Sequence, residues 1–315
     1  MKKGLLVLMF CLAPLGAGAQ QQEPNWASVE TVEVQAPPGP ALWHIARGNS
    51  EVWVLGTVGA MPSDLNWNRN ALADLITGAR AILMPPRPSI GILEGAWFLI
   101  TNGSKLSLPH GQTLEGNLPE ALRKHFIATR TAIGRDEGRY RTDTPLRAAW
   151  RLQYDFQDKT KLYNYEPRHS IETLASQKHV PIAPIAKYEI LDAVKDVLKL
   201  NPAQQQACLA EEVEDIDRLS AHASAAAKAW AVGDLKTVKD NYAESRLNDC
   251  VVAAVNSIAN INERNVADSV AAIDAALNQP GKTVMVIGIG PLLRKNGVLE
   301  RLAAKNVVIE GPADQ

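Results

Sequence analysis

Two periods of hydrophobic residues run along this chain, and they mark its strands and helices. Short apolar runs at residues 41–46 and 51–58 flank a polar stretch, in which Gly48 and Asn49 can adopt the positive φ angles of a tight turn. This pattern predicts a β-hairpin. Further on, Leu146, Trp150 and Tyr154 recur at four-residue spacing, as on one face of a helix. The same criterion predicts helices at residues 64–78, 118–134, 144–161 and 170–178, with short strands at 79–84 and 180–185.

The second half of the chain is dominated by helical periodicity. Residues 188–277 read as helix, interrupted at Asn201–Pro202 and at Gly233–Asp234. A strand at 283–287, a helix at 292–305 and a strand at 307–310 follow. Because strand and helix alternate at both ends, we expect an α/β fold. A mixed central sheet would be formed by the N- and C-terminal segments, with a large helical insertion between them.

The N-terminus has the pattern of a secretory signal peptide. Lys2 and Lys3 precede an apolar stretch at residues 4–15, and small residues lead to Ala19. A membrane anchor would need about 20 continuous apolar residues, which Gly16 ends too early. We therefore expect cleavage after Ala19 and a periplasmic or secreted protein.

The domain organisation follows from this reading. We expect a signal peptide at residues 1–19, a polar, proline-rich flexible leader at 20–39, and one domain at 40–312. A lipid on Cys11 is disfavoured because Phe10 stands where a small residue is required.

Composition narrows the choice of partners. The 33 basic and 34 acidic residues give a formal charge of −1, which argues against nucleic acid or an anionic membrane as the partner. No second apolar run is long enough to span a membrane. Cys208 and Cys250 are the two cysteines beyond residue 19, and an even count in an oxidising compartment favours one disulfide.

Four short motifs in order resemble the TraB/GumN family, which includes the Tiki-type metalloproteases. They are Ala-Leu-Trp-His-Ile at 41–45, Val-Leu-Gly-Thr-Val-Gly at 54–59, Ile-Asn-Glu-Arg-Asn at 261–265 and Val-Ile-Gly-Ile-Gly-Pro-Leu at 286–292. Each motif is weak alone, but their order and spacing match across residues 40–312. The resemblance implies a site at the C-terminal edge of the sheet, where two histidines and a glutamate bind a divalent metal.

This sequence departs from the family pattern at each of those positions. Gly59 and Pro291 stand where the two histidines are expected, and Pro85 stands where the glutamate is expected. Residues 184–186 replace a further Leu-Glu-Thr motif. Neither glycine nor proline has a side chain that can bind a metal or transfer a proton. The resemblance therefore implies a degenerate site without a metal or other cofactor.

Part of the family pattern survives as candidate binding residues. Thr57, Glu263, Arg264 and Asn265 are retained, and the planar guanidinium of Arg264 suits a carboxylate or phosphate group. The alternative is that Glu263 and Arg264 form ordinary ion pairs.

The turn at Gly288 and Gly290 has two interpretations. A Gly-x-Gly turn before a helix can bind a phosphate, but the full fingerprint would need glycine where Leu293 stands. Close backbone packing is the alternative.

Other catalytic patterns are missing from the sequence. It contains no Gly-x-Ser-x-Gly motif, and no two of its six histidines have ligand spacing. An acidic run could bind cations, although such runs usually form solvated helix faces. Its members are Glu211, Glu212, Glu214, Asp215 and Asp217.

Two functional hypotheses follow. The first is a catalytically degenerate member of the family that acts in binding or scaffolding in the cell envelope, with an envelope protein or a small ligand as its partner. The second is a metal-dependent hydrolase or peptidase of the Tiki-like type with unrecognised ligands. It would use Glu263, Arg264 and an acid from the helical insertion.

Overall fold

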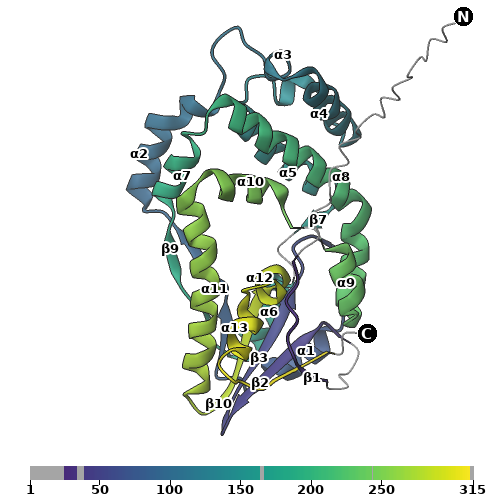
Figure 1. Cartoon of the computed structure of the whole chain (residues 1–315), viewed down its shortest axis with the longest axis vertical. Coiled ribbons are helices and arrows are strands. Elements are labelled where there is room, and N and C mark those ends of the chain that lie inside the picture. The colour runs from purple at the N-terminus through teal and green to yellow at the C-terminus, as the bar shows by residue number, and fades with distance from the viewer. Residues whose placement is uncertain (1–24, 34–38, 164–166, 243, 313–315) are drawn as a thin grey trace, which may run out of the picture.

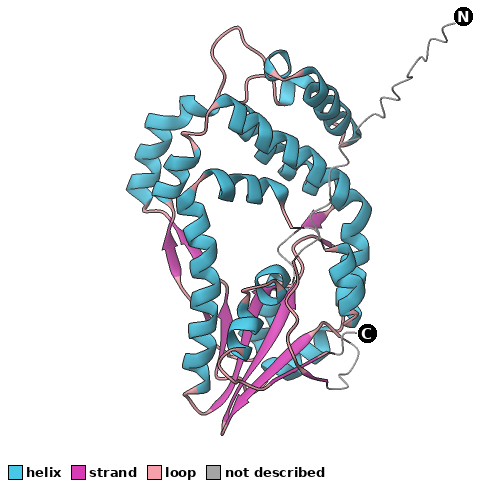
Figure 2. Cartoon of the chain, in the orientation of Figure 1, coloured by secondary structure: helices cyan, strands magenta, loops and turns pink. Residues whose placement is uncertain are grey.

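A computed structural model describes residues 25–33, 39–163, 167–242 and 244–312. Most strands lie at one end of the molecule, and long helices extend from them to the other end (Figure 2). This arrangement confirms the predicted α/β fold with its mixed sheet and its large helical region.

The main sheet has seven strands in the order β1-β11-β2-β3-β10-β5-β8. Its central pair is β3 and β10, which run parallel over eight residue pairs and end at Thr57 opposite Gly288. The strands are β1 (Val32–Glu33), β2 (Leu42–Arg47), β3 (Ser50–Thr57), β5 (Ala81–Met84), β8 (Ile182–Pro184), β10 (Gly281–Gly288) and β11 (Ile309–Gly311). Two small sheets pair β4 (Met61–Pro62) with β7 (Leu162–Tyr163), and β6 (Arg87–Ser89) with β9 (Lys187–Glu189).

The predicted hairpin is confirmed. β2 and β3 pair antiparallel, and the turn between them contains Gly48 at a φ of +59°. A residue with a Cβ atom would be strained there, which explains the glycine.

Most of the helices lie where the sequence predicts helical segments, but the chain divides these segments into more and shorter helices than predicted. The first half of the chain forms α1 (Arg69–Ile76), α2 (Ile92–Asn102), α3 (Leu114–Asn117), α4 (Glu120–Ala132), α5 (Pro145–Thr160) and α6 (Arg168–Gln177). The second half forms α7 (Leu191–Val197), α8 (Pro202–Val232), α9 (Leu235–Asn241), α10 (Arg246–Ala254), α11 (Asn256–Leu277), α12 (Ile289–Leu293) and α13 (Val298–Ala303).

Local signals set the ends of the longest helix. Asn201 and Gln204 form a capping box at the start of α8, and Gly233 ends the helix at a φ of +79°. Both interruptions predicted in the helical region are therefore confirmed. The predicted helix at 292–305 is wrong, because the chain turns between α12 and α13. At that turn a Cβ atom on Gly297 would lie 2.5 Å from the carbonyl oxygen of Arg294.

The leader differs from the sequence expectation over residues 25–33. Its β1 strand pairs with β11, and the Trp26 ring lies 5.6 Å from that of Tyr242. The Ala27 amide also donates to the Leu293 carbonyl. Val32 pairs with Glu310 and Glu33 with Gly311, and local composition gives no sign of pairing between segments so far apart in the sequence. The predicted signal peptide lies outside the described residues.

Two hydrophobic clusters stabilise the chain. One surrounds the sheet and includes Trp43 and Trp230, and the other joins α4, α5, α8 and α10. The Trp230 indole donates to the Gly56 carbonyl over 2.6 Å and so attaches the end of α8 to β3. A Cβ atom on Gly56 would lie 2.7 Å from the Trp43 ring, so this contact requires glycine.

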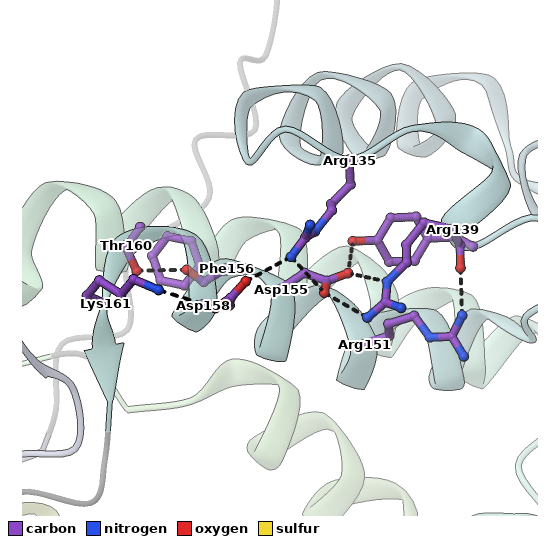
Figure 3. Close-up of polar contacts among 9 residues, drawn as sticks. Arg135, Arg139, Arg151, Asp155, Phe156, Asp158, Thr160 and Lys161 are labelled. Atoms are coloured by element: carbon purple, nitrogen blue, oxygen red, sulfur yellow. Dashed lines mark hydrogen bonds and ion pairs between the residues drawn. The ribbon is translucent and has the colours of Figure 1, made fainter.

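A buried carboxylate between the helices is compensated by basic and phenolic side chains. Asp155 on α5 accepts hydrogen bonds from Arg139 and from the Tyr140 hydroxyl, and it forms an ion pair with Arg135 (Figure 3). Burial raises the pKa of Asp155, but the hydrogen bonds from Arg139 and Tyr140 outweigh it and hold that pKa below its usual range.

The second cluster also contains the predicted disulfide. Cys208 on α8 and Cys250 on α10 are bonded, with Cα atoms 5.4 Å apart. The bond joins two helices that are 42 positions apart in sequence.

We expect the double substitution Cys208→Ser/Cys250→Ser to lower the free energy of unfolding by roughly 4 kcal/mol, because the open chain recovers the entropy of a loop of this length. Denaturant unfolding would measure the change. Adding reductant should destabilise the wild-type protein but leave the double variant unchanged. Equal stability of wild type and variant under oxidising conditions would contradict a stabilising disulfide.

Candidate functional site

A cavity of about 330 Å³ lies beyond the carboxyl ends of β3 and β10. Segments from both halves of the chain form its wall. The lining residues are Gly59 and Ala60 after β3, Gln153, Asp215, Leu219, Tyr242, Glu244, Ser245, Asn248, Asp249, Asn262, Asn265, Pro291 and Arg294. The parallel register of β3 and β10 places this cavity, because their ends reach the same edge of the sheet.

The helical insertion approaches the sheet at the turn after β10. A Cβ atom on Gly290 would collide with the Glu244 carboxylate and would lie 2.7 Å from the Tyr242 hydroxyl. α12 is only five residues long and begins directly at this turn. The geometry favours close packing over phosphate binding as the reason for the glycine. A Cβ atom on Gly288, at the end of β10, would lie 3.5 Å from the Pro291 ring, which is an ordinary van der Waals contact.

Two of the three positions at which the family resemblance implies a metal ligand lie at the cavity. Gly59 and Pro291 both line it, whereas Pro85 follows β5 and is not among its lining residues. The two expected histidines would therefore have faced the same space. In this chain that part of the wall contributes no metal ligand.

The surviving candidate residues separate in the structure. Asn265 lines the cavity. Glu263 instead forms an exposed ion pair with Arg301 at 2.8 Å, and the Arg264 guanidinium lies 4.7 Å from the centre of the Tyr188 ring. The Thr57 hydroxyl donates to the Ile287 carbonyl between the two central strands.

The acidic run on α8 is not the uniformly solvated face that its sequence indicates. Glu212 is 0% exposed and Asp215 is 2% exposed, while the other three acids remain at the surface. The Asp215 carboxylate accepts hydrogen bonds from Arg218, the Ser245 hydroxyl and the Leu247 amide. Asp215 therefore ties α8 to the start of α10 at the edge of the cavity.

Sequence reasoning missed the most polar part of the wall. Glu244 and Asp249 lie on either side of the start of α10, and Arg294 ends α12. None belongs to a motif, so no sequence signal marked them beyond the general expectation of an acid from the insertion. Burial raises the pKa of Glu244, the Asp249 charge adds to this, and Arg294 opposes it.

The charge state of Asp249 depends on the same neighbours. Partial desolvation and the adjacent Asp215 raise the pKa of Asp249, and Arg294 again lowers it. Desolvation likewise raises the pKa of the Tyr242 hydroxyl, which stays protonated at neutral pH. The cavity wall thus holds carboxylates, a guanidinium and a phenol within electrostatic range of one another.

These residues do not fit the divalent metal that the family resemblance implies. Gly59 and Pro291 supply no donor atom, and Asp215 is committed to three hydrogen-bond donors. Within the described ranges, no group of three or more histidine, cysteine, aspartate or glutamate side chains is arranged to hold a metal ion.

Comparison with known proteins identifies the family of this chain. The profile of the TraB/PrgY/gumN family matches residues 41–311. The chain therefore belongs to this family. No curated protein and no solved structure gives a significant match. In the part of the chain that the structure covers, no helix has the length and apolar character needed to cross a membrane.

Glu212 makes stability depend on pH. Burial raises its pKa from 4.5 to about 9, and neither carboxylate oxygen has a hydrogen-bond partner within the described chain. The folded state therefore holds a proton that the unfolded state releases above pH 4.5, so stability falls as pH rises from there to about 9.

We expect Glu212→Gln to stabilise the protein at pH 8 by several kcal/mol, at about 1.4 kcal/mol per pKa unit, and much less at pH 5. Melting temperatures at both pH values would measure this, with the exposed Glu214→Gln as the matched control. Parallel pH profiles for wild type and Glu212→Gln would show that Glu212 is not buried as a neutral acid.

Proposed function

We propose that this protein is a catalytically degenerate member of the TraB/PrgY/gumN family that acts by binding. One observation carries the proposal. A cavity lies where the family resemblance implies a site, and Gly59 and Pro291 line it at the positions where metal-binding histidines are expected. A metal-dependent hydrolase needs about three protein ligands and an open position for water, which this wall does not provide.

The remaining wall supports a binding role. A volume of about 330 Å³ is within the usual range for small-molecule sites. Polar side chains from α5, α8, α10 and α11 also line the cavity, and they can form hydrogen bonds to a bound ligand. A small ligand or an envelope protein is the partner in this proposal.

The cell envelope is the proposed location. The signal-peptide pattern at residues 1–19 supports export to the periplasm or beyond. The Cys208–Cys250 bond supports an oxidising compartment, since cytosolic thiols are kept reduced.

One observation favours the second candidate, a metal-dependent hydrolase with new ligands. The insertion brings the carboxylates of Glu244 and Asp249 into the family's cavity. Glu263 and Arg264, which the sequence offered for this role, bind elsewhere on the surface. The hydrolase would therefore depend on Glu244 and Asp249.

We expect purified mature protein to contain no stoichiometric zinc, manganese or cobalt by elemental analysis, and to show no peptidase activity when these ions are added. Gly59→His alone should not create activity, because one ligand cannot fix a coordination geometry. One equivalent of metal, with chelator-sensitive hydrolysis that Glu244→Gln abolishes but Glu263→Gln does not, would establish the hydrolase instead.

A further inference from the structure

The charged groups of the cavity lack partners in the protein. Across the described chain, the side chains of Glu244, Asp249 and Arg294 form no hydrogen bond or ion pair, although Arg294 lowers the pKa of both carboxyl groups. Asp155, by contrast, is held by two arginines and a tyrosine, and Figure 3 shows this network. Asp155 thus has its charge compensated within the protein, whereas these three cavity groups have no such partner among the described residues.

The two signs of charge restrict what that partner can be. A simple cation would be attracted by Glu244 and Asp249 but repelled by Arg294, and a simple anion would meet the reverse. Asp215 does not change this balance, because its ion pair with Arg218 already compensates its charge. A ligand that carries both charges satisfies all three groups.

The rest of the wall suits such a ligand. Amide side chains of Gln153, Asn248, Asn262 and Asn265 line the same cavity, and each offers both donors and acceptors. These neutral groups can bind the polar atoms between two charged ends without favouring either sign. A guanidinium also matches a carboxylate with two parallel hydrogen bonds.

We propose that the cavity binds a small zwitterion, with its ammonium group at Glu244 and Asp249 and its carboxylate at Arg294. This inference rests on the proposed binding function and names its ligand class. The volume of about 330 Å³ limits the ligand to a small molecule.

A series of ω-amino acids tests the proposal, because it varies the distance between the two charges. Calorimetry at pH 7 would compare glycine, 4-aminobutyrate and 6-aminohexanoate with butylamine and butyrate, which carry one charge each. At least one zwitterion should bind 10-fold or more tightly than either singly charged probe, since a hydrogen bond to a charged group contributes about 1.5–3 kcal/mol.

Conservative variants assign the two ends. Glu244→Gln and Asp249→Asn should each weaken the best zwitterion roughly 10-fold without weakening butyrate, whose repulsion they reduce, whereas Arg294→Gln should weaken the zwitterion and butyrate alike. Glu263→Gln is the matched control and should change nothing. Melting temperatures would verify that each variant folds.

Two results would overturn the inference. One is butylamine or butyrate binding as tightly as every zwitterion, and the other is no binding of any probe at tens of millimolar. If the protein is free of metal and inactive, either of these binding results overturns the zwitterion site but leaves the proposed degenerate function intact. Bound metal together with hydrolysis would overturn the proposed function, irrespective of which probes bind.

A separate feature concerns α2, which carries an exposed apolar stripe. Ile92, Leu93, Trp97 and Ile100 are 90%, 85%, 68% and 78% exposed, and their spacing places them on one face of the helix. α2 lies at the outer edge of the molecule, beside α7 (Figure 1). A stripe of this kind on a soluble protein marks an interaction site.

The chemistry of the stripe favours a second copy of this chain. Glu94 is the one charged residue of α2, and the helix has no lysine or arginine to attract an anionic lipid surface. The four side chains expose on the order of 500 Å². A two-fold pairing of this stripe with itself would bury about 1,000 Å², which reaches the size of a specific interface.

We infer that α2 mediates a symmetric homodimer, and sedimentation velocity over micromolar concentrations tests this. Wild type should be dimeric, and Leu93→Glu/Ile100→Glu should weaken dimerisation by 100-fold or more. Val232→Glu, at an exposed apolar position on α8, should leave it unchanged. A wild-type monomer at all concentrations would refute the inference, and so would a dimer that the α2 substitutions do not weaken. Flotation of the protein on phosphatidylglycerol vesicles, if Trp97 is required for it, would show that the stripe binds a membrane instead.

Discussion

The parallel pairing of β3 with β10 is the constraint on which the rest of the structure depends. It aligns Ser50–Thr57 with Gly281–Gly288, so the whole helical insertion must leave the sheet and return to it. Parallel strands end at the same edge, and the cavity lies beyond that edge. The fold thus places a site at this edge, whatever side chains the chain supplies there.

Two attachments then decide what the insertion contributes to that site. The Trp230 indole fixes the end of α8 to the Gly56 carbonyl, and the Cys208–Cys250 bond fixes α8 to α10. Between these attachments the chain brings Glu244 against Gly290. The cavity therefore has one wall formed by Gly59 and Pro291 and another wall with charges that have no partner among the described residues.

The elements that sequence predicted well are those with local causes. The hairpin depends on Gly48, and the boundaries of α8 depend on the Asn201 cap and on Gly233. The β1 strand and the division of residues 292–305 into two helices were not predictable in this way. Both arise from contacts between segments that are distant in sequence or from a close backbone approach at Gly297.

The sequence alone indicated the family of this protein, and it also showed that the side chains of Gly59 and Pro291 supply no metal ligand in any fold. Only the tertiary structure decided which acids face the cavity. Glu212 and Glu214 are alike in sequence, yet one is buried and the other solvated, and Glu244 belongs to no motif. Burial and proximity are set by how helices pack across the whole chain, and local sequence does not encode that packing.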